Sequence, residues 1–120
     1  MSFVEKRKHK RFPINQEGFF KGHQTAQENC IIRNLSLGGV FIETPSLLPV
    51  GSSLTVSCKV AEEIGELCLS GVVVRVNTNE SIEPRGMGAQ FSSLTFSQLA
   101  AFKKLISWWK DHNPTRDIYP

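Results

Sequence analysis

The spacing of apolar and polar side chains divides the chain into two regions. Between residues 14 and 92, short apolar runs are separated by turn residues. The run from Ser53 to Val60 alternates apolar and polar positions, as a half-buried strand does. On this pattern we expect six strands, over residues 18–23, 28–33, 39–43, 53–60, 66–76 and 86–91. Six short strands with turns between them predict an antiparallel β-barrel or sandwich. Gly71, inside the fifth run, predicts a bulge or a sharp bend.

After residue 94 the apolar spacing becomes that of a helix. Thr95 and Gln98 have the spacing of a capping box, and Asn113 followed by Pro114 predicts where the helix ends. The apolar positions that share one helical face are Phe96, Leu99, Phe102, Leu105, Ile106 and Trp109. We expect this face to pack on the sheet, with binding to a partner as the alternative. Trp108 is expected at the edge of the face.

Length and composition favour one folded domain. The chain has 120 residues, of which 40% are hydrophobic, enough for a core without disulfides or metals. We expect a flexible basic arm over residues 1–13, a barrel with its helix over 14–113, and a tail over 114–120. Three cysteines without close pairing are expected to be reduced core residues: Cys30, Cys58 and Cys68. With no membrane-length apolar run and no secretory signal pattern, a cytoplasmic location is expected.

Positive charge is concentrated near the N-terminus. The net charge is only +3, yet five of the fourteen lysines and arginines lie within residues 6–11. Such a cluster predicts an anionic partner. The alternative is a solvated tail that binds no ligand.

Two short motifs give this partner a chemical identity. Arg7 and Arg11 lie four residues apart, and a guanidinium group can bind phosphate oxygens through two hydrogen bonds or stack on a purine. After a gap long enough for one hairpin come Asn34, Ser36 and Gly39. Asn34 can donate to and accept from a base edge or cap the turn, and Ser36 offers a small hydroxyl. Gly39 permits close approach of a ligand to the backbone or a positive φ. An ordinary turn would also use these residue types.

The paired motifs resemble those of the PilZ family of bacterial cyclic di-GMP receptors, over roughly residues 6–110. The resemblance implies a six-stranded antiparallel barrel with a C-terminal helix. It also implies that Arg7 and Arg11 bind phosphates and stack on guanine, while Asn34, Ser36 and Gly39 contact a guanine. Lys6, just before the first arginine, stands where the family residue influences whether one ligand or two bind. Arg75, in a strand that resembles a family strand, would add positive potential.

We therefore predict a receptor for cyclic di-GMP that closes its arm over the ligand and signals by binding an unidentified partner protein, in motility or biofilm regulation. The alternatives are a ligand-free interaction module and a small basic barrel that binds nucleic acid. No catalytic or metal-binding motif appears, so neither an enzyme nor a cofactor-dependent protein is expected.

Overall fold

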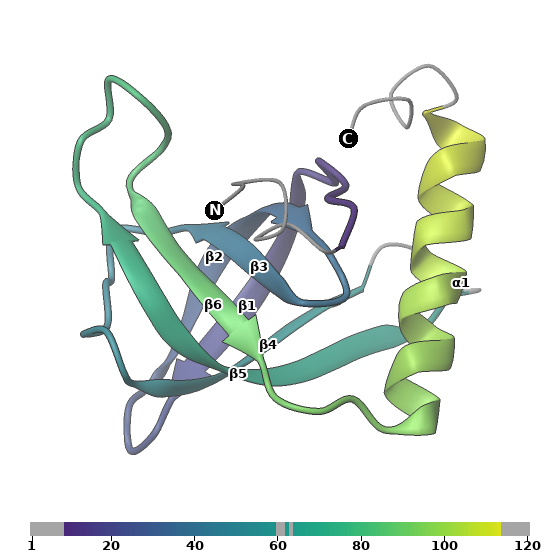
Figure 1. Ribbon diagram of the computed structural model, residues 1–120, viewed down its shortest axis with the longest axis horizontal. Helices are drawn as coiled ribbons and strands as arrows, with labels where there is room; N and C mark the ends of the chain where they lie inside the picture. The colour runs from purple at the N-terminus through teal and green to yellow at the C-terminus, as the bar shows by residue number, and fades with distance from the viewer. Residues whose placement is uncertain (1–8, 60–61, 63, 114–120) are drawn as a thin grey trace, which may run out of the picture.

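The computed structural model describes residues 9–59, 62 and 64–113, and these residues form a closed β-barrel with one helix against it (Figure 1). All neighbouring strands are antiparallel, and their order around the barrel is β1-β2-β3-β6-β5-β4. The prediction of a six-stranded antiparallel barrel with a C-terminal helix is confirmed. The elements are β1 (Gln16–Gly22), β2 (Gln27–Leu35), β3 (Gly39–Glu43), β4 (Ser53–Lys59), β5 (Glu66–Asn77), β6 (Gly86–Phe91) and α1 (Phe96–His112).

The barrel interior follows from the alternation of side chains along each strand. In β4, Leu54, Val56 and Cys58 are buried, whereas the residues between them face outward. Each fully buried Leu or Val contributes about 1.5–3 kcal/mol of hydrophobic free energy relative to an exposed one. The inward positions of all six strands join in one apolar cluster. This cluster provides the main stabilisation of the barrel.

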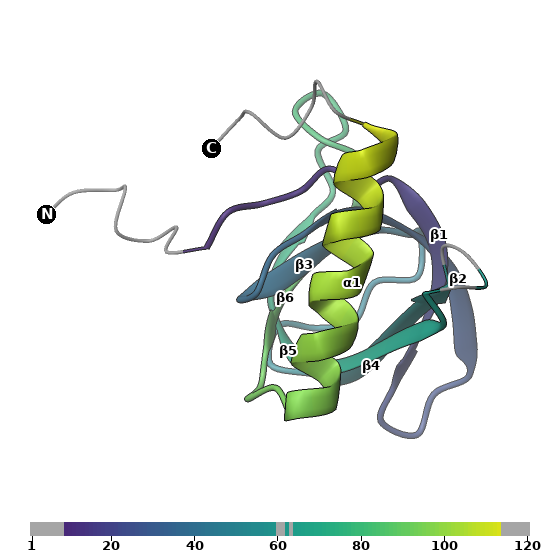
Figure 2. The same cartoon turned by 90° about the vertical axis from the view of Figure 1, so that its right-hand side faces the viewer.

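Helix α1 completes the same cluster (Figure 2). Its capping box is present, because the Gln98 amide donates to Thr95 Oγ1 at 3.1 Å and the Thr95 amide donates to Gln98 Oε1 at 2.9 Å. The buried face comprises Phe102, Leu105, Ile106 and Trp109. No helix in the described part of the chain combines the length and apolar character needed to cross a membrane.

Two expectations for the helix have different outcomes. Phe96 was assigned to the apolar face but is 93% exposed, because it lies in the first turn, where α1 begins. That prediction is wrong. Trp108 is partly buried against the edge of the cluster, as expected.

Two further predictions concern β5. The prediction that Cys68 lies in the core is wrong: it is exposed, since it alternates with the inward-facing Leu67 and Leu69. A bulge at Gly71 is not observed either, because the register of β5 against β6 shifts between Val73 and Arg75, and the alternative of a sharp bend at Gly71 stays a prediction. At Gly71 a Cβ would lie 2.5 Å from the Gln90 carbonyl oxygen, so glycine is needed there for the close approach of β6.

The segment before β1 is tied to the end of β2. Phe12 and Leu35 exchange two backbone hydrogen bonds, of 2.8 and 2.9 Å, as an isolated antiparallel bridge. The Phe12 side chain is buried and meets Trp109 of α1 edge-on, with ring centroids 5.8 Å apart. Pro13 disfavours a helix here, and the extended conformation that it predicts is observed. The bridge fixes Arg11, the preceding residue, beside the C-terminal end of β2.

Candidate ligand-binding site

The loop between β2 and β3 is held by Ser36. Its amide donates to the Gly39 carbonyl at 2.9 Å, and its Oγ accepts from the amides of Gly38 and Gly39, both at 3.1 Å. Ser36 is buried. These hydrogen bonds define the shape of a tight loop whose backbone is fixed before any ligand arrives.

Gly39 is required by the packing of β3 on β6. A Cβ at this position would lie 2.4 Å from the Ala89 carbonyl oxygen. Gly39 is not among the residues with positive φ, which among the described glycines are Gly51 and Gly65. The positive φ that the sequence allowed for this glycine is not observed, and the backbone atom that lies close to it belongs to strand β6. Close approach of a ligand at Gly39 stays a prediction.

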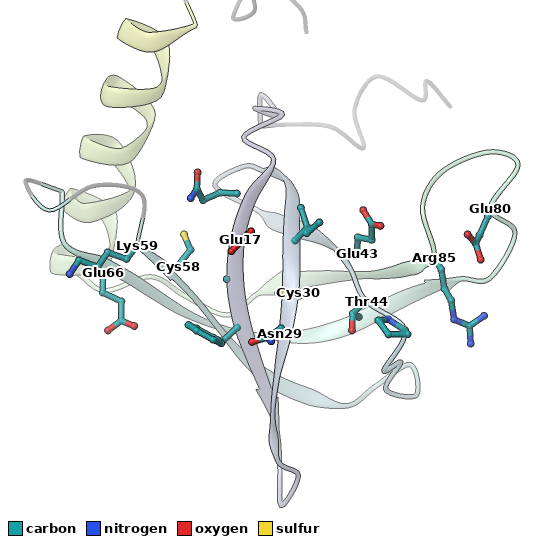
Figure 3. Close-up of a pocket in the computed structure, with 15 residues that line it drawn as sticks. Glu17, Asn29, Cys30, Glu43, Thr44, Cys58, Lys59, Glu66, Glu80 and Arg85 are labelled. Carbon is teal, nitrogen blue, oxygen red and sulfur yellow. The ribbon is translucent and has the colours of Figure 1, made fainter.

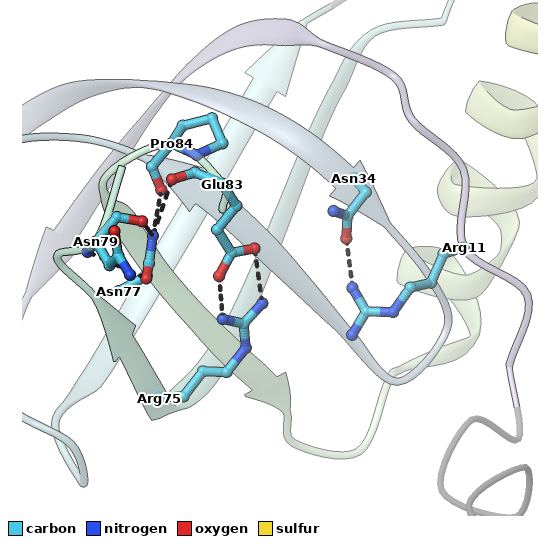
Figure 4. Close-up of polar contacts among 7 residues, drawn as sticks. All are labelled: Arg11, Asn34, Arg75, Asn77, Asn79, Glu83 and Pro84. Carbon is cyan, nitrogen blue, oxygen red and sulfur yellow. Dashed lines mark hydrogen bonds and ion pairs between the residues drawn. The ribbon is translucent and has the colours of Figure 1, made fainter. Parts of the chain in front are cut away.

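The two sequence motifs meet at Arg11 and Asn34. Arg11 Nη1 donates to Asn34 Oδ1 at 2.5 Å, across 23 positions of sequence (Figure 4). Both side chains are partly buried. A cationic fork therefore lies against an amide that can donate and accept, which is the combination that the sequence predicted for an anionic ligand with polar base edges. Lys6 and Arg7 lie outside the described residues.

Two β-bulges place Asn34 and Arg75 on the outer surface of the barrel. The register shifts once in β2, between Ile32 and Asn34, and once in β5, between Val73 and Arg75. Ile32 and Val73 belong to the core. In a strand with regular alternation, the side chain two positions after an inward-facing residue also faces inward. The extra residue of each bulge changes this phase, so that the polar side chain two positions on faces outward.

Because of these bulges, four strands contribute to one row of cross-strand partners. Asn34 of β2 pairs with Phe41 of β3, Phe41 pairs with Gly88 of β6, and Gly88 pairs with Arg75 of β5. Cross-strand partners project from the same face of a sheet. We call these four residues the outer row.

Phe41 forms an aromatic centre in the outer row. It is only 2% exposed but is not part of the interior cluster to which its neighbours Val40 and Ile42 belong. The Arg75 guanidinium carbon lies 4.8 Å from the centre of the Phe41 ring. Gly88 makes room for this, since a Cβ there would lie 3.2 Å from Arg75 Cγ. The Arg75 guanidinium thus lies over the face of an aromatic ring.

Glu83 holds Arg75 in this position. The two guanidinium nitrogens Nη1 and Nη2 donate to the two carboxylate oxygens, the second at 3.3 Å (Figure 4). The hydrogen bond from Arg75 lowers the pKa of Glu83 below its usual value; the charges of Arg75 and Arg11 act in the same direction, against partial burial. Asn77 Nδ2 anchors the loop by donating to the carbonyl oxygens of Glu83 and Pro84, at 2.9 and 3.1 Å.

Sequence reasoning missed Glu83 and Phe41. Glu83 lies in a polar loop and Phe41 within an uninterrupted apolar run, so neither residue differs from its neighbours in type. The register of the strands places Phe41 beside Arg75, and the loop that Asn77 anchors places Glu83 there. The site as a whole combines two arginines, one carboxylate, one amide and an aromatic ring.

A cavity of about 840 Å³ lies elsewhere, over β1 and β2, and contains none of the predicted site residues (Figure 3). Its lining includes Glu17, Glu43, Glu66 and Glu80, which disfavour an anion. The thiols of Cys30 and Cys58 also line it. Burial is the main cause that raises the pKa of Cys30 to about 12, with a smaller effect from Cys58. Burial likewise raises the pKa of Cys58 to about 11, with a smaller effect from the charge of Glu66. Such thiols stay protonated and are poor nucleophiles. No metal-binding group of His, Cys, Asp and Glu occurs among the described residues.

Comparisons with known proteins match nearly the whole chain. The family model described as PilZ domain matches residues 5–108. No curated protein sequence matches.

Similar solved structures include the PilZ domain of YcgR from Escherichia coli with c-di-GMP (14% identity, TM-score 0.68, covering 90% of this chain and 94% of that one). The inhibitor of motility MotI/DgrA from Bacillus subtilis has 20% identity and a TM-score of 0.68 over 92% of this chain. The chain spans about half of MotI, covering 53% of its length. PlzA from Borreliella burgdorferi, solved in complex with c-di-GMP, has 17% identity and a TM-score of 0.54 over 87% of this chain and 37% of PlzA. At these identities the similarity shows a shared fold.

Proposed function

The chain belongs to the PilZ domain family, and we propose that it is a receptor for cyclic di-GMP that binds the nucleotide over the outer row and the Ser36–Gly39 loop. One observation carries the proposal: Arg11 from the basic segment and Asn34 from the second motif are in direct hydrogen bond, beside an arginine whose guanidinium lies over an aromatic ring. YcgR and PlzA, which share the fold, were solved with this ligand.

The chemistry of the ligand suits the side chains that meet here. Cyclic di-GMP carries two phosphates and two guanines. Arg11 would exchange its hydrogen bond to the neutral amide of Asn34 for bidentate ones to an ionised phosphate, in which both partners carry charge. Asn34 would then be released to bind the guanine edge, where its amide matches neighbouring donors and acceptors. Arg75 offers the planar face of its guanidinium group for stacking on a purine ring.

The roles of Ser36 and Gly39 in this proposal follow from the shape of the loop. The Ser36 hydroxyl keeps the loop tight, and the absence of a side chain at Gly39 keeps β3 close to β6. Arg7 and Lys6 would enter the site from the N-terminal segment. We propose that this segment closes over the ligand and that the remade surface is what a partner protein binds, as a regulator of motility or biofilm formation.

A calorimetric titration of cyclic di-GMP tests the proposal. We expect micromolar affinity for the wild-type chain, or about −8 kcal/mol. Arg7→Ala and Arg11→Ala should each weaken binding about tenfold or more, since a hydrogen bond to a charged group contributes roughly 1.5–3 kcal/mol. Arg85→Ala is the matched control: it removes the same charge from the lining of the separate cavity and should leave affinity unchanged.

Two results would contradict the proposal. The first is no heat with cyclic di-GMP, which would favour a ligand-free interaction module. The second is salt-dependent binding of a single-stranded oligonucleotide together with indifference to the dinucleotide, which would favour a nucleic-acid binder.

A further inference from the structure

A second hollow, of about 510 Å³, lies between α1 and the segment that precedes β1. Figure 2 shows the helix and this segment running close to each other at the same end of the barrel. None of Arg11, Asn34, Arg75 and Glu83 lines the hollow, so it is separate from the candidate ligand site. We call it the helix groove; its lining residues are His9, Lys10, Phe12, Leu37, Phe102, Lys103, Ile106, Ser107 and Lys110.

The helix groove has an apolar floor. Phe12, Phe102 and Ile106 are buried members of the core cluster, and Leu37 packs partly against them. An apolar floor at the surface, bounded by two different segments, is suited to an inserted aliphatic or aromatic side chain.

The rim of the groove is cationic. Lys10 comes from the segment before β1, and Lys103 and Lys110 come from α1. The ammonium groups of Lys10 and Lys110 lie 5.8 and 5.5 Å from the centre of the Phe12 ring, so two charges from opposite walls converge on one floor residue. Among the described lining residues there is no aspartate or glutamate. The rim therefore lacks internal compensation and is complementary to an acidic partner.

We propose that the helix groove docks an acidic segment of a partner protein, in which carboxylates flank an apolar anchor residue. The concavity and the apolar floor decide between kinds of partner. A flat membrane surface would meet the rim but leave the floor unfilled, and a nucleic-acid backbone has no group that gains from Phe12, Phe102 and Ile106. A peptide with alternating acidic and apolar side chains satisfies both.

The groove and the ligand site share one segment, and this link rests on the proposed function. Lys10 and Phe12 line the groove, whereas Arg11 between them donates to Asn34. His9 packs on the loop, with its Cδ2 2.9 Å from where a Cβ on Gly38 would lie. A nucleotide that fixes Arg11 therefore also fixes one wall of the groove. Cyclic di-GMP should tighten peptide binding, and by linkage the peptide should tighten nucleotide binding by the same factor.

The test uses the full chain and a short fluorescein-labelled peptide of alternating glutamate and leucine. We expect binding by fluorescence anisotropy, with amide shifts in NMR spectra concentrated at the groove residues. Peptides with lysine for glutamate, or with serine for leucine, should not bind. Lys103→Glu should weaken binding about fivefold or more, whereas Lys104→Glu, an equal charge reversal at an exposed neighbour outside the groove, should have little effect.

The outcomes separate this inference from the proposed function. Equal binding by the Lys103→Glu and Lys104→Glu variants would overturn the groove proposal, as would binding to anionic vesicles in place of the peptide. Absent peptide binding with normal cyclic di-GMP calorimetry overturns the groove alone. Peptide binding without any nucleotide binding overturns the receptor and the link, and leaves the groove supported.

Discussion

Replacing Gly39 with alanine tests whether this motif glycine is required by the barrel itself. The added Cβ would lie 2.4 Å from the Ala89 carbonyl oxygen, a backbone atom held in the β3–β6 ladder. The two strands would have to separate by roughly half an ångström or more, and overpacking of this kind typically costs about 1–3 kcal/mol. For a domain of this size, such a loss lowers Tm by roughly 4 °C per kcal/mol.

Gly38→Ala is the matched control. There the new Cβ would lie 2.9 Å from a ring carbon of His9, an exposed side chain that can rotate away. We expect a loss below about 1 kcal/mol, as for most surface substitutions. Urea unfolding of both variants, followed by circular dichroism, measures the difference. Equal stability of the Gly39→Ala and Gly38→Ala variants would refute the packing argument, and a normally stable Gly39→Ala variant that has lost only cyclic di-GMP binding would assign the glycine to ligand approach.

Three further outcomes can be measured directly. The pKa of Glu83 is lowered in the folded state, so its contribution to stability is present above its unfolded pKa and is lost as pH falls through the folded pKa. In urea unfolding at a series of pH values, Glu83→Gln should therefore lose less free energy of unfolding than the wild type below about pH 5. An equal loss in both proteins would contradict this. A maleimide should label Cys68 quickly in the native protein but Cys30 and Cys58 only after unfolding. If mass spectrometry detects rapid labelling of all three cysteines, the burial of Cys30 and Cys58 is contradicted. Thr95→Ala should lower the free energy of unfolding by about 1 kcal/mol through loss of the capping box, whereas Thr95→Ser should restore most of it.

Most of the architecture could be predicted because its signals are local. The alternation in β4, the capping box at Thr95 and the end of the helix before Pro114 each depend on residues close in sequence. The meeting of Arg11 with Asn34 was also predictable, because the gap between the motifs fits one hairpin.

The composition of the outer row could not be predicted, since it depends on register. Nothing in residue type marks the bulges in β2 and β5, and Gly71, the one residue that suggested a bulge, serves the approach of β6 instead. Phe41 lies in a continuous apolar run, which hides its outward direction. Pairing between Arg75 and Glu83 likewise requires the loop that Asn77 anchors.

Because side chains alternate between the two faces of a strand, the two bulges determine which residues of β2 and β5 lie on the outer surface of the barrel. Removing the bulge residue Val74 would place Arg75 directly after the inward-facing Val73 and leave the guanidinium outside the barrel. Removing a residue elsewhere in β5 would instead reverse the faces of the residues beyond the deletion and direct polar side chains into the apolar interior, where an unpaired charge is strongly unfavourable. The bulges are therefore the positions in β2 and β5 at which evolution could change strand length without exchanging the inner and outer faces of the barrel.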